Sequence, residues 1–344
     1  MSHALLGAIV MAVFAMTLPT KAAEPTHELL RFDELSGWKE DDHQAALTAF
    51  LETCGDVDGE DWSALCSLAK TQPSARTFFE LFFRPVLIKD GNPALFTGYF
   101  EPELSGSMTR TGRYRYPLYR RPPEAQGLWL SRRQIEESNA LQGRGLEICW
   151  VDDPVEVFFL QIQGSGRIRL TNGEILRVGY GGANGHTYQS IGQELVRRGV
   201  YRAHQVSAQV IQNWVRRNPV DGVELLRHNP SYVFFRRLRD LPEEKGPLGA
   251  MNRSVTPMRT VAVDPNYVPL GAPIWVEKRG SGAFNRLMIA QDTGSAIKGA
   301  QRADIFYGSG DGAGREAGKV RDPGRMVVLL PIQVAFQLVP EDAG

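Results

Sequence analysis

The chain has 344 residues, and its 39 Lys and Arg balance its 39 Asp and Glu, so the formal net charge is zero at pH 7. Hydrophobic residues make up 42% of the sequence and charged residues 23%, which excludes a disordered or fibrous protein. The charge balance gives no general attraction to nucleic acid or to anionic membranes. The length suits about two domains, and we expect a ligand that is neutral or of mixed charge.

Residues 1–23 have the pattern of a secretory signal peptide. An apolar run from Ala4 to Leu18 is followed by Pro19 and by small residues up to Ala23, where cleavage is expected. The run is short for a membrane span, and an uncleaved anchor is the alternative. No cysteine in this segment could accept a lipid, so the sequence predicts a soluble exported protein.

The three cysteines are Cys54, Cys66 and Cys149. In an oxidising compartment Cys54 and Cys66 could close a short loop, which leaves Cys149 without a partner. The apolar neighbours of Cys149 indicate a buried cysteine in a strand rather than a nucleophile.

Residues 43–54 and 75–86 have apolar residues at helical spacing, and a further helix is expected from Ser131, which can form a capping box with Gln134. Between them, Pro and Arg cluster in residues 114–127, as in a crossing between domains.

Residues 154–180 are predicted to form three strands, separated by a Gly-Ser-Gly turn and an Asn172-Gly173 hairpin turn. Alternation would place Gln161 and Gln163 on one face of the first strand. Helices are then expected in residues 188–199, 207–219 and 220–230.

The last hundred residues contain short apolar segments separated by Gly and Pro turns. They predict strands at 259–264, 272–277, 286–290, 303–307 and 325–334. Strands this short favour a small barrel over a doubly wound sheet.

The motifs of several enzyme classes are missing. The six histidines never fall at metal-ligand spacing, and neither CxxC nor HExxH occurs, so no metal site is expected. The GSGDGAG sequence of residues 308–314 lacks the GK[ST] ending of a phosphate loop and does not open a clear amphipathic helix. GxSxG is also missing, and no cofactor is expected.

Aspartates at strand ends remain as candidates. Asp264, Asp292 and Asp304 each adjoin an apolar strand and lie beside Gly or Pro turns. The Asp264-Pro265 pair indicates a turn. The small residues around Asp292 and Asp304 would let a bulky ligand approach the backbone.

Six segments resemble the lytic murein transglycosylase A family, whose C-terminal part is called the three-aspartate (3D) domain. They are TGYFEP (97–102), QIQGSGRI (161–168), YGGANGHTYQSIG (180–192), NPSYVFF (229–235), VAVDPNYVPLG (261–271) and QDTGSAIKGAQRADIFYG (291–308).

This resemblance implies a mainly β fold with α-helices. A double-psi β-barrel would be formed by residues 24–104 and 246–344, and a second α/β, barrel-like domain, residues 105–245, would be inserted between them. A groove between the two domains would hold a glycan strand.

The resemblance also implies a lyase that cleaves the β-1,4 bond between N-acetylmuramic acid and N-acetylglucosamine without water, leaving a 1,6-anhydro end. Asp304 matches the catalytic acid of the family. One acid is enough because the C6 hydroxyl of the sugar replaces water as the nucleophile, and Asp304 can then act as the base. Asp292 would tune Asp304 or hold a sugar hydroxyl, and the sequence leaves both roles open.

The other matching positions are expected to contact the glycan: Thr97, Tyr99, Glu101, Gln163, Ser165, Asn184, His186, Tyr188 and Asp264. Tyr307 or Trp150 could cover a sugar face, although Trp150 fits the core better. For Asn184 and His186 the alternative is that they shape a glycine-rich turn.

The best-known members of the family are outer-membrane lipoproteins, whereas this sequence predicts a free periplasmic enzyme. Its expected partners are peptidoglycan strands and, beyond them, proteins of cell-wall synthesis or division, with no nucleic acid. Two rival functions stay open: a hydrolytic muramidase with Asp292 or Glu101 as second carboxylate, and a non-catalytic peptidoglycan-binding module.

Overall fold

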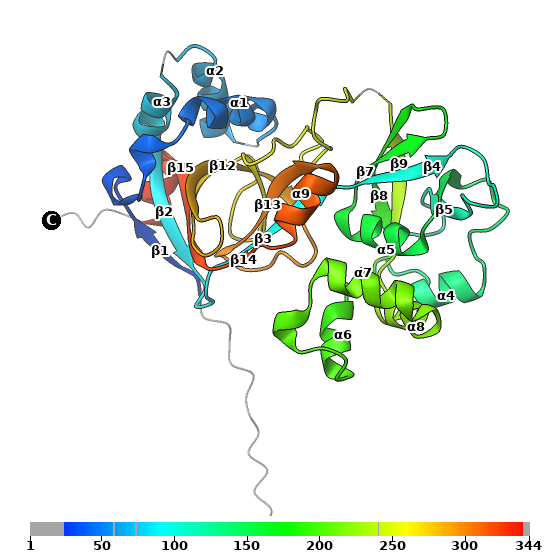
Figure 1. Ribbon diagram of the computed structural model, residues 1–344. Coiled ribbons are helices and arrows are strands. Elements are labelled where there is room, and N and C mark those ends of the chain that lie inside the picture. Colours follow the sequence, from blue (N-terminus) through cyan, green and yellow to red (C-terminus); the bar gives the residue numbers. More distant parts are fainter. Residues whose placement is uncertain (1–23, 58, 73, 240, 340–344) are drawn as a thin grey trace, which may run out of the picture.

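The structure is a computed structural model that describes residues 24–339 apart from 58, 73 and 240. The predicted signal peptide, residues 1–23, lies outside the described residues. Two mixed sheets with helices organise the described chain, and one of them forms a nearly closed barrel (Figure 1).

The barrel sheet combines strands from both ends of the chain, in the order β1-β2-β15-β11-β12-β10-β13-β3-β14. Its strands are β1 (Thr26–Leu29), β2 (Phe83–Lys89), β3 (Leu95–Glu101), β10 (Thr260–Val263), β11 (Pro273–Lys278), β12 (Phe284–Thr293), β13 (Arg302–Ser309), β14 (Arg321–Asp322) and β15 (Gly324–Pro331). Every residue of β10 and β11 is buried, which explains their almost continuous apolar sequence. The prediction of a small barrel is confirmed, and its sheet takes strands from both ends of the chain.

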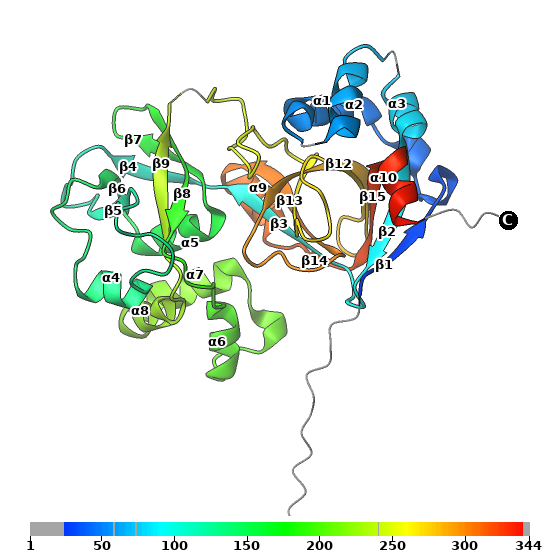
Figure 2. The same cartoon turned by 180° about the vertical axis from the view of Figure 1, so that it is seen from behind.

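The second sheet has the order β5-β6-β4-β7-β8-β9 and lies in the predicted insertion, except that β4 begins at Glu103, before the predicted boundary at 105. Its strands are β4 (Glu103–Ser107), β5 (Tyr116–Tyr119), β6 (Glu147–Val151), β7 (Gly166–Leu170), β8 (Ile175–Ala183) and β9 (Val233–Leu238). Its helices are α4 (Arg132–Glu137), α5 (Pro154–Gln163), α6 (Ile191–Arg197), α7 (Ala208–Arg217) and α8 (Pro219–His228). Figures 1 and 2 both show this part beside the barrel, joined to it by the run from β3 into β4.

The predicted strand at 154–163 is wrong, because this segment forms helix α5. The Asp153 side chain accepts a hydrogen bond from the Val155 amide at 2.8 Å and caps the helix, and Pro154 occupies its first turn. Gly164, with φ of 79°, ends it in the left-handed conformation. On a helix, Gln161 and Gln163 point in different directions, so they do not share a face.

Helices α1 (His43–Thr53), α2 (Glu60–Ala69) and α3 (Ala75–Phe82) pack beside the barrel, as Figure 1 shows in blue. The expected helix at 75–86 is too long, since strand β2 begins at Phe83. The expected strand at 325–334 ends at Pro331, where helix α10 (Ile332–Leu338) follows. The capping box of Ser131 and Gln134 is confirmed.

The cysteines behave as the sequence allowed. Cys54 and Cys66 form a disulfide across 12 positions of the sequence. Cys149 is free and fully buried in β6, where burial raises the pKa of its thiol to about 12. This thiol is therefore a core side chain rather than a nucleophile.

Candidate active site

The two aspartates lie in one row across neighbouring strands of the barrel. Ala262 of β10 pairs with Asp292 of β12 on one side and with Asp304 of β13 on the other. Asp304 in turn pairs with Thr97 of β3. Paired residues project from the same face of a sheet, and two strand spacings amount to about 10 Å. The fold thus brings together Asp292, Asp304 and Thr97, with the small residue Ala262 paired between the two acids.

A short relay of hydrogen bonds orients the carboxyl group of Asp304. The Thr97 hydroxyl donates to Oδ1 of Asp304 at 2.5 Å and accepts from Nη2 of Arg302 at 2.8 Å. Because a guanidinium can only donate, Arg302 directs the hydroxyl proton of Thr97 toward Asp304. Oδ1 is thereby an acceptor, and Oδ2 is the oxygen available to carry a proton.

Burial raises the pKa of Asp304 above its ordinary value, against the opposing effects of the Thr97 hydrogen bond and the Arg302 charge. Part of the residue still reaches solvent. A carboxyl group in such a desolvated but accessible place can hold a proton and deliver it to a ligand.

Asp292 has a fuller set of partners. Its Oδ2 accepts from the Tyr99 hydroxyl at 2.9 Å, and its Oδ1 accepts from the backbone amides of Ala250 at 3.0 Å and Thr293 at 2.9 Å. Burial raises the pKa of Asp292 to about 6, and the nearby Asp304 adds to this, while the three hydrogen bonds oppose it. The Tyr99 ring packs on Phe306 at a centroid distance of 5.1 Å, which fixes its hydroxyl beside Asp292.

Glu101 is placed differently from the two aspartates. Its side chain is 1% exposed and pairs with Arg167 at 2.8 Å and Arg177 at 2.7 Å, both from the inserted domain. The Ser309 hydroxyl also donates to it at 2.7 Å. This arrangement makes Glu101 a bridge between barrel and insertion, and it leaves no carboxylate oxygen for water or sugar.

Among the candidates from the inserted domain, Asn184 and His186 differ in how far they are buried. Asn184 is fully buried, and its amide bonds to the carbonyls of Leu130 and Pro230 and to the amide of Tyr232. This geometry gives Asn184 the loop-shaping role. His186 bonds to the Trp129 carbonyl at 2.8 Å but keeps some exposure.

Gln163, at the end of α5, reaches the barrel, where its Oε1 accepts from the Phe100 amide at 3.4 Å. Ser165 is buried just beyond it. Tyr188 is partly exposed, and burial raises the pKa of its hydroxyl. Tyr307 and Trp150 are also partly exposed, in β13 and β6.

Asp264 forms the turn that its sequence indicated. It is 3% exposed, and its carboxylate accepts from the amides of Asn266 at 3.2 Å and Gly299 at 3.0 Å. Although burial acts to raise the pKa of Asp264, these bonds and the charge of Lys298 lower it overall. Asp264 is therefore an ionised turn residue whose oxygens are occupied, whereas burial raises the pKa values of Asp292 and Asp304.

Among the glycines of residues 308–314, Gly314 allows close packing, whereas Gly308, Gly310 and Gly312 leave room around their β-carbon positions. The segment forms most of helix α9 (Gly310–Ala317), which the sequence pattern did not predict, and this helix lies against β3 (Figure 1). A β-carbon on Gly98 would lie 2.7 Å from the backbone of Ala317, and one on Gly314 would lie 2.7 Å from the Phe100 ring. Small residues here let helix and strand touch, directly beside the Asp304 strand.

Sequence reasoning missed Arg302 and Ala262. Arg302 stands two positions before Asp304, so strand alternation puts both on one face, and that spacing was a usable signal. Ala262 carried no signal, because its importance lies in being small between two acids.

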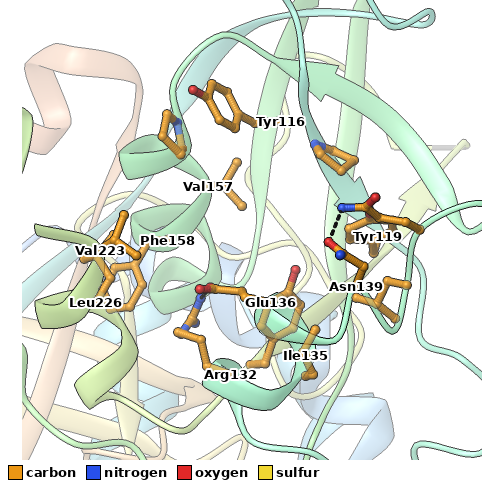
Figure 3. A pocket seen from close by; sticks show the side chains of 15 residues that line it. Tyr116, Tyr119, Arg132, Ile135, Glu136, Asn139, Val157, Phe158, Val223 and Leu226 are labelled. Carbon is orange, nitrogen blue, oxygen red and sulfur yellow. Dashed lines mark hydrogen bonds and ion pairs between the residues drawn. The ribbon is translucent and has the colours of Figure 1, made fainter. Parts of the chain in front are cut away.

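A cavity of about 260 Å³ lies away from the aspartates, in the inserted domain. Figure 3 shows apolar side chains of α5 and α8, including Phe158 and Leu226, facing Arg132 and Glu136 of α4 across it. Arg132 is buried and stacks on Phe158 and Tyr232, and burial lowers its pKa.

In the part of the chain that the structure describes, no group of His, Cys, Asp and Glu is arranged to hold a metal. None of the helices in that part has the length and apolar character needed to span a membrane.

Comparisons with known proteins agree with this architecture. Residues 95–236 match the family model of the MltA specific insert domain, and residues 259–330 match that of the 3D domain. Membrane-bound lytic murein transglycosylase A of Vibrio cholerae serotype O1 is 35% identical over 268 residues, which cover 74% of this chain and 70% of that protein. The protein of the same name from Escherichia coli strain K12 is 37% identical over 245 residues, or 68% of this chain and 65% of its own.

Solved structures give the same result. The membrane-bound lytic murein transglycosylase of Agrobacterium tumefaciens superimposes with a TM-score of 0.83 at 32% identity, covering 91% of this chain and 99% of that one. The E. coli MltA structure with bound chitohexaose superimposes with a TM-score of 0.69 at 27% identity, covering 84% and 90%.

The split barrel, the inserted domain and the aspartates on the 3D strands define the class of lytic transglycosylases that act on murein. Within that class, the chain belongs to the membrane-bound lytic murein transglycosylase A family.

Proposed function

We propose that this protein cleaves the β-1,4 bond between N-acetylmuramic acid and N-acetylglucosamine in peptidoglycan and leaves a 1,6-anhydro end, with Asp304 as the only acid and base. The observation that carries the proposal is the environment of Asp304: a partly accessible carboxyl group whose pKa is raised by burial and whose Oδ1 is held by Thr97. Family membership supports murein as the substrate.

The proposed reaction balances without water. Oδ2 of Asp304 gives its proton to the oxygen that links the two sugars, and the bond from that oxygen to C1 of N-acetylmuramic acid breaks. The C6 hydroxyl oxygen of the same sugar bonds to C1 and closes the anhydro ring, and its proton passes to the Asp304 carboxylate. Asp304 returns to its protonated form, so one carboxyl group serves both steps.

The other carboxyl groups support a one-acid reaction. Glu101 is occupied by Arg167 and Arg177. Asp292 is bonded to Tyr99 and to two backbone amides, and it lies two strands from Asp304. We assign to Asp292 and Tyr99 a role in holding sugar hydroxyl groups beside the scissile bond. Gln163, Ser165, His186 and Tyr188 stay predicted glycan contacts, and the groove that would bring them to the substrate belongs to the same proposal.

Glycan binding has support from one relative, since the E. coli structure holds chitohexaose. A periplasmic location and an enzyme without a lipid anchor remain predictions, as they depend on residues 1–23. Release of the protein by osmotic shock would support them, and retention in the membrane fraction would support the uncleaved anchor.

Mass spectrometry of the products tests the proposal. Purified peptidoglycan is digested with the wild-type protein, with Asp304→Asn and with Asp292→Asn. The proposal expects muropeptides lighter than hydrolysed ones by one water from the wild type and none from Asp304→Asn. Products with a reducing end would overturn it in favour of a muramidase, and binding without any products would favour a peptidoglycan-binding module.

A further inference from the structure

Residues 245–255 return the chain from the inserted domain to the barrel, and we call them the strap. The strap folds back on itself, because the Gly249 amide bonds to the Arg253 carbonyl and the Val255 amide bonds to the Pro247 carbonyl, each at 2.9 Å. An isolated bridge between Leu248 and Ser254 closes the same turn. The strap is drawn in yellow between the barrel and the inserted domain in Figure 1.

The tip of the strap touches Asp292. The Ala250 amide donates to Oδ1 of Asp292 at 3.0 Å. At Gly249 the strap lies so close to β12 that a β-carbon there would stand 2.6 Å from the carbonyl oxygen of Gln291. Only glycine allows this approach, so the position of the strap sets the distance from the Ala250 amide to the carboxylate.

Ion pairs hold the strap from the outer side. Arg253 makes a bidentate pair with Asp56, at 2.9 Å for both contacts, and Lys245 pairs with Glu52 at 2.6 Å. Asp56 lies in the loop that the Cys54–Cys66 disulfide closes.

The inserted domain contributes as well. Arg236 of β9 donates to the Asn252 side chain at 2.8 Å. Arg177, which is bonded to Glu101, donates to the Lys245 carbonyl at 2.8 Å. The strap is therefore held by Glu52 and Asp56 at the end of α1, by the inserted domain and by Asp292 itself.

We propose that Arg253 is a positioning residue: paired with Asp56 of the disulfide-closed loop, it presses the strap onto β12 and keeps the Ala250 amide on Asp292. Most exposed ion pairs contribute little to stability, but a bidentate Arg–carboxylate pair fixes geometry. The proposal extends the site of the proposed function, although its main test does not depend on catalysis.

The groups that face Asp292 define what the strap can change. Tyr99 approaches from β3, Asp304 from β13 and the uncharged Ala262 from β10, while Thr293 donates from the strand of Asp292 itself. Among these groups of the described chain, Asp304 is the one other carboxyl group. The Ala250 hydrogen bond favours ionised Asp292, whereas burial favours the protonated form. Arg236 and Arg177 still hold the strap over the carboxyl group when Arg253 is removed, so loss of the Ala250 bond alone should raise the pKa of Asp292.

The test is a carbon-13 NMR titration of aspartate carboxyl groups in the full-length protein without substrate, with the Asp292 signal assigned by its loss in Asp292→Asn. Arg253→Ala should shift the Asp292 titration upward by roughly one pH unit, the effect of losing one charge-assisted hydrogen bond. The control is Arg144→Ala, which removes an Arg–Glu pair of similar exposure in the inserted domain and should leave the titration unchanged.

Exchange of the two charges, Asp56→Arg with Arg253→Asp, should return the titration toward the wild-type value. The Cys54→Ala, Cys66→Ala double variant should shift it upward, as Arg253→Ala does. An unchanged titration in folded Arg253→Ala would overturn the proposal.

Gly249→Ala provides a second route, because the added methyl group pushes the strap off β12, and Gly112→Ala, where the methyl group meets open space, is its control. An upward shift of the Asp292 titration in Gly249→Ala and no shift in Gly112→Ala would support the proposal. The same titration in both variants would contradict it. Since no turnover is measured, failure of the proposed reaction would leave these outcomes unaffected.

Discussion

The Thr97 hydroxyl donates a 2.5 Å hydrogen bond to Asp304, although 207 positions separate the two residues in the sequence. Parallel pairing of β3 with β13 brings them side by side, with the whole inserted domain between them in the chain. The acid and the group that orients it thus come from the two separate portions of the barrel. Assembly of the candidate site therefore requires both portions to fold together.

Thr97→Val should weaken catalysis and move its pH dependence upward. Removing the hydroxyl takes away a hydrogen bond that lowers the pKa of Asp304, so that pKa rises. The acid must be protonated to act, and a higher pKa keeps the proton to higher pH. We expect the alkaline limb of kcat to move to higher pH and the maximal rate to fall about tenfold, as expected for one lost orienting bond.

The rate of release of soluble anhydro-muropeptides, measured across pH, checks this prediction. Thr97→Ser keeps the hydroxyl and should keep the alkaline limb in place. A limb that moves to lower pH in Thr97→Val would show that the hydroxyl does not act on the catalytic acid.

The candidate acids could be predicted from the sequence because local patterns indicate them. Asp292 and Asp304 each belong to an apolar strand, and the 12 positions between them leave room for a strand return. The partners of these acids could not be read in this way. Tyr99 lies 193 positions from Asp292, and only the register of the folded sheet brings them together.

Helix α5 shows a different limit. Its Val and Phe residues favour a strand by composition, but the Asp153 cap, Pro154 and Gly164 are helix boundary signals in the same segment. The boundary signals prevailed because the helix buries Val155, Phe158 and Leu160 against its neighbours. Glu101 shows a third limit, since the two arginines that occupy it come from strands whose approach no local pattern predicts.

Asp292→Asn should stabilise the protein at neutral pH. The folded pKa of Asp292, about 6, lies above the unfolded value near 3.9, so the stability that this group contributes is complete below about pH 4 and is lost as pH rises through 6. The loss amounts to about 2–3 kcal/mol at pH 7.5. Asparagine stays neutral, and the Tyr99 hydroxyl can accept from its amide instead of donating.

Urea unfolding of wild type and Asp292→Asn from pH 4 to 8 measures this difference. The two free energies of unfolding should agree within error near pH 4 and separate in favour of the variant above pH 6. A variant that is less stable than wild type at pH 7.5 would mean that the ionised carboxylate stabilises this site.

Asp264→Asn should have the opposite effect. The pKa of Asp264 is lowered in the folded protein, so its contribution is present above the unfolded pKa and is lost as pH falls through the folded value. Asparagine would turn an amide group toward the Gly299 or Asn266 donors and leave one of them unsatisfied, at a cost of about 1–3 kcal/mol. Urea unfolding at pH 7 should show this loss of stability. The difference in free energy of unfolding between wild type and Asp264→Asn should become smaller at acid pH. Equal stability at pH 7 would contradict the turn-forming role.

Glu101→Gln should destabilise the protein strongly, because it leaves the guanidinium groups of Arg177 and Arg167, which are 4% and 13% exposed, without a counter-charge. Breaking a buried ion pair in this way costs about 3–5 kcal/mol. Glu103→Gln is a matched control, since the Glu103–Arg169 pair lies two positions further along both segments than Glu101–Arg167, but its side chains are 32% and 53% exposed. Its loss should cost less than about 1 kcal/mol. Urea unfolding of both variants at pH 7 measures the two costs, and similar small losses would show that Glu101 does not bind the inserted domain to the barrel.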